Sequence, residues 1–145
     1  MSKRNRVVLD FDGVIHSDTS GWRGIAVCND PPVDGIANAI SDIRKAGYEV
    51  AVVSSRTKNW RGKRAIRKYL KKHEIEVDLI CKEKPPARVY VDDRALRFDG
   101  DASTLLGEIA NFEPYWKREK KDKRFGLGRS GNRAAFCYSK MVVRQ

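Results

Sequence analysis

The sequence predicts an α/β fold in which helices cover both faces of a mostly parallel sheet. Short apolar runs alternate along the chain with segments whose apolar residues recur at helical spacing. The first two runs contain VVL and VAVV, which are apolar at consecutive positions, and such strands are typical of a sheet buried on both faces. The length of 145 residues suits one domain with a core of its own.

The elements are expected in the order βαβαββα. The strand runs are rich in β-branched residues, and the helical segments place apolar side chains on one face. The segment at 14–32 contains turn residues and ends in two prolines, so we expect a loop or small flap there, a minimal cap. Strands are predicted at residues 6–11, 49–54, 77–81 and 88–91, and helices at 33–46, 60–73 and 102–112.

The positive charge of the chain is concentrated in two places. Residues 117–145 hold ten lysines and arginines against two acids, a net charge of +8 out of the total of +11. This predicts one domain at 1–116 followed by a basic tail at 117–145, flexible or partly docked. Residues 56–72 hold nine basic residues and no acid. Such clusters indicate a phosphate-bearing or acidic partner, and a solvated basic face is the competing interpretation.

Two classes of protein are disfavoured by composition. No apolar run approaches the roughly 18 residues of a membrane span, so we expect a soluble, cytoplasmic protein without a membrane partner. The three cysteines form no C-x-x-C pair and only two histidines are present, which disfavours a zinc site and indicates free thiols. The sequence gives no prediction of oligomeric state.

Polar groups follow each predicted strand, at the edge where ligands bind in open α/β sheets. Asp10 and Asp12 end the first strand, and Asp92 and Asp93 end the fourth. Carboxylates crowded together repel unless a cation lies between them, and oxygen ligands without histidine favour a hard ion. We therefore predict a Mg²⁺ site whose ligands are Asp10, Asp12, Asp92 and Asp93.

The remaining strand ends supply groups that suit a phosphoryl substrate. Catalysis of phosphoryl transfer consists largely of holding and neutralising the charged oxygens. A serine hydroxyl can donate to one oxygen, a lysine can neutralise another, and an arginine can bind in a planar fork. The predicted catalytic residues besides the aspartates are Ser54 and either Lys82 or Lys84, and the predicted phosphate contacts are Ser55, Arg56 and Gly13.

Each of these residues also has a purely structural interpretation. A calcium loop of the EF-hand type is disfavoured because its glycine belongs at the sixth position, and Gly13 is only the fourth from Asp10. Ser54 and Ser55 could serve only to cap the next helix, a role that we expect for Ser55 or Thr57. Asp92-Asp93-Arg94 by itself would suit a surface turn. Because all these residues occur at successive strand ends, a catalytic site is favoured over the structural interpretations.

The four motifs VVLDFDGV, VVSSR, a lysine and VYVDDR, in this order, resemble those of the haloacid dehalogenase-like (HAD) superfamily over residues 6–99. The resemblance implies a HAD-like fold with a Rossmann-like sheet. It also implies Asp10 as nucleophile, forming an aspartyl-phosphate, and Asp12 as general acid and then general base. It implies Ser54 as the second-motif hydroxyl, Lys82 or Lys84 as the phosphate-neutralising lysine, and Asp92 with Asp93 as magnesium ligands. An acid two residues after the nucleophile implies phosphate chemistry.

Ser54-Ser55-Arg56 with Asp92-Asp93-Arg94 is also similar to the 3′-phosphatase domain of bacteriophage-type polynucleotide kinase/phosphatases, and KPPARVYVDDRALRFDGD to small HAD proteins of phages and bacteria. The chain has no G-x-x-x-x-G-K-[ST] kinase loop. The expected substrate is a nucleotide or polynucleotide 3′-phosphate, since an open site beside a basic helix suits a nucleic acid end. A nucleic-acid-binding protein with little turnover and a small-molecule phosphatase are the two alternatives.

Overall fold

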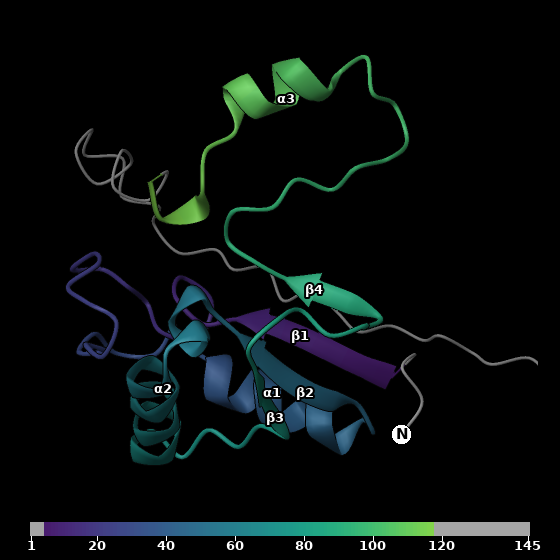
Figure 1. Cartoon of the computed structure of the whole chain (residues 1–145). Coiled ribbons are helices and arrows are strands. Elements are labelled where there is room, and N and C mark those ends of the chain that lie inside the picture. The colour runs from purple at the N-terminus through teal and green to yellow at the C-terminus, as the bar shows by residue number, and fades with distance from the viewer. Residues whose placement is uncertain (1–4, 118–145) are drawn as a thin grey trace, which may run out of the picture. The chain divides into compact units, whose positions relative to one another are not determined.

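The structure, a computed structural model, describes residues 5–117 (Figure 1). The chain divides into two units, the first ending at Phe112 and the second beginning at Glu113. All strands and named helices belong to the first unit. The predicted tail at 117–145 lies, apart from Lys117, outside the described residues, so its flexibility and the predicted boundary at 116 stay predictions.

Four parallel strands form one sheet, which confirms the predicted α/β class. Their spatial order is β3-β2-β1-β4, so β1 lies between β2 and β4 (Figure 1). The chain therefore reverses direction across the sheet beside β1, and ligands bind at such switch points in α/β folds. The strands are β1 (Arg6–Asp10), β2 (Glu49–Val53), β3 (Leu79–Cys81) and β4 (Val89–Val91).

The three predicted helices are present, with ends within three residues of those expected from the sequence. One further element was not predicted, a four-residue 3₁₀ helix named η2 directly after β2, because a helix of this length has no periodicity to detect. The helices are α1 (Ile36–Lys45), η2 (Ser55–Lys58), α2 (Trp60–Lys72) and α3 (Leu105–Asn111).

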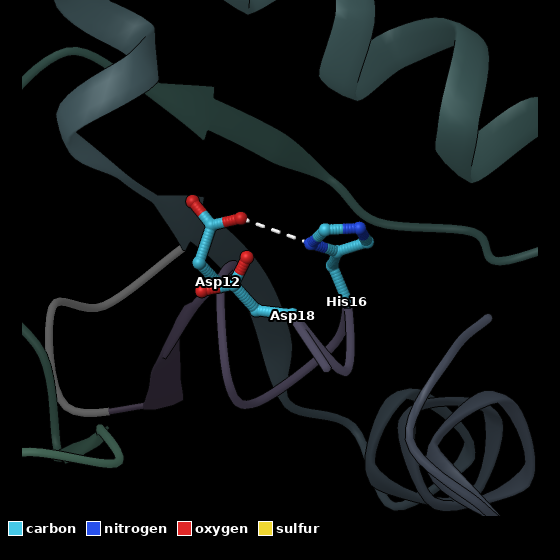
Figure 2. A group of neighbouring side chains, drawn as sticks. All are labelled: Asp12, His16 and Asp18. Carbon is cyan, nitrogen blue, oxygen red and sulfur yellow. Dashed lines mark hydrogen bonds and ion pairs between the residues drawn. The ribbon is translucent and has the colours of Figure 1, made fainter. Parts of the chain in front are cut away.

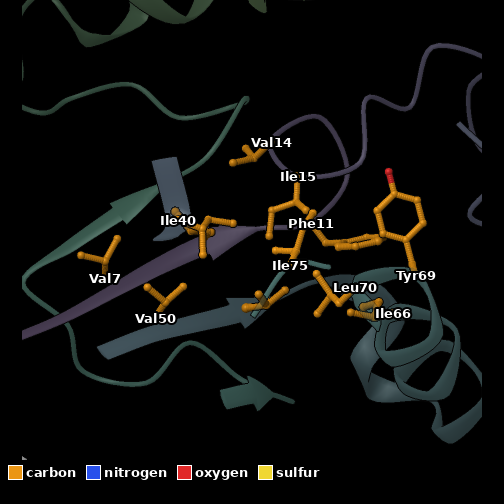
Figure 3. Packing of buried hydrophobic residues seen from close by; sticks show 12 residues of the cluster. Val7, Phe11, Val14, Ile15, Ile40, Val50, Ile66, Tyr69, Leu70 and Ile75 are labelled. Atoms are coloured by element: carbon orange, nitrogen blue, oxygen red, sulfur yellow. The ribbon is translucent and has the colours of Figure 1, made fainter. Parts of the chain in front are cut away.

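The core lies between one face of the sheet and both α1 and α2 (Figure 3). Alternate residues of β1 and β2, such as Val7 and Val50, pack with Ile40 of α1 and Ile66 of α2. Since the chain moves from β1 to β2 to β3 in one direction, two right-handed crossovers place both helices on the same face. Val8 and Ala51 are buried on the other face, and α3 buries none of its residues.

The segment between β1 and α1 is a loop whose two ends are joined by backbone contacts. It is not a separate cap domain, as expected for a minimal cap. His16 pairs through its backbone with Asp12 and with Pro32, which brings the two ends of the segment together. Ser17 N–H donates to the Pro31 carbonyl at 3.0 Å. No helix within residues 5–117 is long and apolar enough to cross a membrane.

Candidate active site

The site lies where β1 ends, and a glycine makes its turn possible. Asp10 is the last residue of β1, and Gly13 follows with a φ of +88°, a conformation that L-residues with side chains rarely adopt. A Cβ atom on Gly13 would overlap the Asp93 carboxylate. Gly13 thus allows the loops after β1 and β4 to approach closely. Its N–H donates to the His16 carbonyl at 2.7 Å, so its predicted phosphate contact stays a prediction.

Asp10, Asp92 and Asp93 form a first acidic group, which we call the Asp10 group. Their carboxylate oxygens lie within 4.8 Å of one another, because β1 and β4 are neighbours in the sheet. The pKa of Asp10 is raised to about 6, mainly by burial and in addition by the charges of Asp92 and Asp93, while the hydrogen bond from the Phe11 N–H acts to lower it. Three partly buried carboxylates with only oxygen donors fit a hard divalent cation such as Mg²⁺.

The structure distinguishes the two candidate lysines. Lys84 Nζ lies 3.3 Å from Asp92 Oδ2, and Lys84 lines a small cavity together with Asp10. Lys82 is exposed and lines neither of the two cavities beside Asp10. The geometry therefore favours Lys84 as the lysine of the site.

Asp12 belongs to a second group with His16 and Asp18, which we call the Asp12 group (Figure 2). His16 Nδ1 lies 3.0 Å from Asp12 Oδ1, and His16 Nε2 accepts a hydrogen bond from the Asp30 N–H at 3.2 Å. With Nε2 as acceptor, a neutral His16 carries its proton on Nδ1, and this N–H donates a hydrogen bond to Asp12. The grouping of the ligand atoms thus places Asp12 with His16 and Asp18, and not in the Asp10 group with which it was predicted to share a metal.

Arg56 completes the surroundings of Asp12. Its Nε lies 2.8 Å from Asp12 Oδ2 and its Nη2 lies 3.0 Å from Oδ1, a two-point contact with the carboxylate. Burial by itself would raise the pKa of Asp12, but the hydrogen bonds from His16 and Arg56 and the arginine charge lower it below its usual value. Asp12 is therefore held as a carboxylate.

Arg56 is completely buried, and its other end faces the loop after β1. Nη1 donates to the Gly24 carbonyl at 2.6 Å, and the guanidinium carbon lies 4.2 Å from the centre of the Trp22 ring. In this structure Arg56 contacts protein groups and does not line the cavity beside Asp10. Its predicted contact with substrate phosphate stays a prediction.

The serines after β2 have two roles. The Ser54 hydroxyl caps η2 by accepting from the Arg56 N–H at 3.2 Å. The helix α2 is capped by Asn59, so neither Ser55 nor Thr57 has the capping role that was considered for them. The Ser54 hydroxyl also lies 3.4 Å from Asp12 Oδ2. Ser55 is exposed and lines the cavity.

A cavity of about 400 Å³ joins the two acidic groups. Three of its residues were not among the predicted site residues: Asp18 and Trp22, which lie in an irregular loop, and Arg94, which entered only as part of the Asp92-Asp93-Arg94 motif. For Trp22 the sequence favours packing against the core over stacking on a base. Of the possible signals, only the position of Arg94 after a strand-end acid pair was available. The lining consists of Asp10, Asp12, Asp18, Trp22, Ser54, Ser55, Asp92, Asp93 and Arg94.

Comparisons with known proteins give a limited result. No protein-family model and no curated protein matches the chain. Among solved structures, a chain of the "Pnkp1/Rnl/Hen1 complex" is similar with 19% identity and a TM-score of 0.47 over 75% of this chain and 36% of that chain. A chain of the "Pnkp1/Rnl/Hen1 RNA repair complex" is similar with 16% identity and a TM-score of 0.44, over 75% and 32%. This chain thus spans about a third of each solved chain.

Proposed function

We propose that this protein is a Mg²⁺-dependent phosphomonoesterase with Asp10 as nucleophile. The observation behind the proposal is the meeting of Asp10, Asp92 and Asp93 at the switch point of a parallel sheet, beside an open cavity. Asp12 follows Asp10 by two residues and lines the same cavity. The order of these motifs, which resembles the HAD superfamily, supports the same chemistry.

The reaction would proceed in two displacements. An Asp10 carboxylate oxygen attacks phosphorus, the bond to the leaving alcohol oxygen breaks, and Asp12 gives that oxygen a proton. Water then attacks the aspartyl-phosphate while Asp12 takes the proton, and phosphate and free Asp10 are released. In the second step Asp12 acts as a base and must be deprotonated, which its lowered pKa favours. In the first step Asp12 acts as an acid, so it must take up a proton beforehand.

The charges around the cavity explain why a cation is needed. Five aspartates line it, against one arginine, and such a lining repels a dianionic phosphate. Asp10, Asp92 and Asp93 would hold Mg²⁺, which supplies charge neutralisation for the phosphoryl oxygens. Ser54, Ser55 and Arg94 line the same cavity, Lys84 lines the smaller one, and all four would be available to contact those oxygens.

The proposed substrates are nucleotide or polynucleotide 3′-phosphates. The support, besides the resemblance, is the outer surface of α2, which begins shortly after Ser54 and is basic throughout its length. Such a surface binds nucleic acid backbones without sequence preference. We call these exposed residues the basic face of α2: Arg61, Arg64, Arg67, Lys68, Lys71 and Lys72.

The same basic face favours a second candidate, a nucleic-acid-binding protein with little turnover. Binding of this kind would persist in Asp10→Asn and would weaken steeply with salt. The first candidate instead requires catalysis that depends on Asp10.

The test is a comparison of phosphate release from 3′-phosphorylated oligonucleotides, nucleoside 3′-monophosphates and sugar phosphates, with Mg²⁺ or with EDTA. We expect release from the first two that is lost in EDTA and in Asp10→Asn, whereas Asp34→Asn, an exposed control, retains it. Release from all substrates that survives both treatments would refute the proposal. Preference for sugar phosphates would indicate a small-molecule phosphatase.

A further inference from the structure

We infer that the Trp22 ring forms one wall of the active site and stacks on the nucleobase of the leaving group. The reaction part of this inference rests on the proposed phosphatase function, and the binding part can be tested without turnover. It assigns substrate selection to the loop after β1 and not to a cap domain.

Trp22 lies at the cavity and remains exposed. It lines the same 400 Å³ cavity as Asp10 and Asp12, and 55% of its surface is accessible. Exposed indole surface lacks the stabilisation that burial in an apolar environment would give. A flat ligand that covers the ring would recover part of it.

The ring is held in place from one side by Arg56. The guanidinium carbon lies 4.2 Å from the ring centre, and the guanidinium itself is buried and bound to Asp12 at two points. A cation over an indole face is a favourable contact, strongest where water is excluded. One face of Trp22 is therefore occupied by a fixed group, and a base would stack on the opposite face.

The loop that contains Trp22 is fixed by hydrogen bonds on both sides of it. Asp30 Oδ2 accepts from the N–H and the hydroxyl of Ser20, both at 2.9 Å, and the Asp30 carbonyl accepts from Tyr69 of α2 at 3.0 Å. After Trp22, the Gly24 carbonyl accepts from Arg56. Because the loop is already ordered, a ligand that stacks on Trp22 pays little ordering entropy.

A nucleobase matches this wall better than a sugar does. Every base has a π-face, and stacking on an aromatic side chain is favourable for all of them.

The binding test uses Asp10→Asn, in which turnover is expected to be absent, with Trp60→Phe and Trp116→Phe so that Trp22 is the single tryptophan. We expect adenosine 3′-monophosphate with Mg²⁺ to quench its fluorescence saturably and glycerol phosphate to leave it unchanged. Absence of quenching by the nucleotide would overturn the inference, even if the wild type proves to be a phosphatase. If the wild type shows no turnover, quenching would still support the wall while the proposed reaction fails.

The kinetic test compares a substrate with a base and one without. We expect Trp22→Ala to lower kcat/KM for adenosine 3′-monophosphate by about 5- to 150-fold, Trp22→Phe to lower it less, and both to leave glycerol phosphate within about twofold. Trp60, 67% exposed on α2 and not in the cavity lining, provides the control Trp60→Ala, expected to change neither substrate. An equal loss on both substrates would mean that Trp22 only supports Arg56 and would overturn the inference.

Discussion

The two acidic groups that line one cavity differ in what neutralises them. In the Asp12 group, a buried arginine binds Asp12 at two points, and His16 donates a further hydrogen bond. In the Asp10 group, the nearest cations are the largely exposed Lys84 and Arg94, at 3.3 and 3.7 Å from Asp92 and Asp93, and the pKa of Asp10 is raised mainly by burial. The protein supplies its own counterion to the first group and leaves the second suited to an external cation.

This difference suits the two proposed roles of Asp10 and Asp12, which are only two residues apart. Asp12 is oriented by the protein and is suited to moving protons, whereas Asp10 lies among carboxylates and is suited to act together with a metal. Proximity in sequence therefore does not imply the same neighbours: Asp10 lies with Asp92 and Asp93, whereas Asp12 lies with His16 and Asp18.

The largest effect is expected from removing the counterion of the Asp12 group. Arg56→Met leaves Asp12 charged and partly buried without its partner, and we expect a loss of about 3 kcal/mol in the free energy of unfolding. Chemical denaturation measures it. Arg61→Met, an exposed arginine of α2, is the control and should change stability by less than about 0.5 kcal/mol. A small effect of Arg56→Met would mean that the Asp12 group needs no internal counterion.

The packing beneath Arg56 offers a second way to disturb the Asp12 group. A Cβ atom on Gly62 of α2 would overlap the Arg56 backbone carbonyl, so we expect Gly62→Ala to destabilise the protein by about 2 kcal/mol. Thermal or chemical unfolding measures it.

Gly107 of α3 is the matched control, because a Cβ atom there meets nothing within 4 Å. Gly107→Ala should stabilise the protein by about 0.5–1 kcal/mol, the usual gain in a helix interior. If Gly62→Ala were stabilising too, close contact between α2 and Arg56 would not matter.

The metal preference of the two groups can be measured directly. Asp93→Asn removes a carboxylate from the Asp10 group, and we expect Mg²⁺ affinity to fall at least about tenfold, since even outer contacts of metal ligands affect affinity by 10–100-fold. Asp18→Asn changes the Asp12 group and should leave affinity unchanged. Calorimetric titration provides the measurement, and the opposite ranking would assign the cation to the Asp12 group.

The smallest effect concerns how stability depends on pH, and it is expected from Asp78, a residue of the scaffold and not of the site. Burial acts to raise the pKa of Asp78, but hydrogen bonds from the Val50 N–H and from Arg44 lower it below 3.8. Because the folded pKa lies below the unfolded one, the stabilisation is complete above the unfolded value and is lost as pH falls through the folded one.

We expect Asp78 to contribute no more than about 1 kcal/mol, since water screens this half-exposed pair. Unfolding free energies of the wild type and Asp78→Asn, measured at a series of pH values, should differ at neutral pH and converge in acid. A constant difference across the series would show that the charge of Asp78 is not involved.

Much of the fold and part of the site were predictable from local pattern. The strands follow from short apolar runs. Gly13, directly after Asp12, indicates a sharp turn, and its φ is indeed positive. Parallel strands bring their carboxyl ends to one edge, so the approach of Asp92 and Asp93 to Asp10 also follows from the pattern.

What the pattern could not supply was the choice of partners. Arg56 and Asp12 are 44 residues apart, and their pairing depends on how η2 and the loop after β1 pack. The preference for Lys84 over Lys82 likewise depends on the path of the chain between β3 and β4. The placement of α1 and α2 on one face follows from strand order, which the sequence does not contain.

The most direct test of the proposed chemistry is detection of phosphate on Asp10. A phosphorylated substrate is mixed with the protein and Mg²⁺, the reaction is stopped rapidly in acid, and the peptide containing Asp10 is analysed by mass spectrometry. We predict a transient mass increase of one phosphoryl group on Asp10, which is absent with EDTA. Phosphate release by the wild type without any such adduct, or undiminished release by Asp10→Asn, would contradict the assignment of Asp10 as nucleophile.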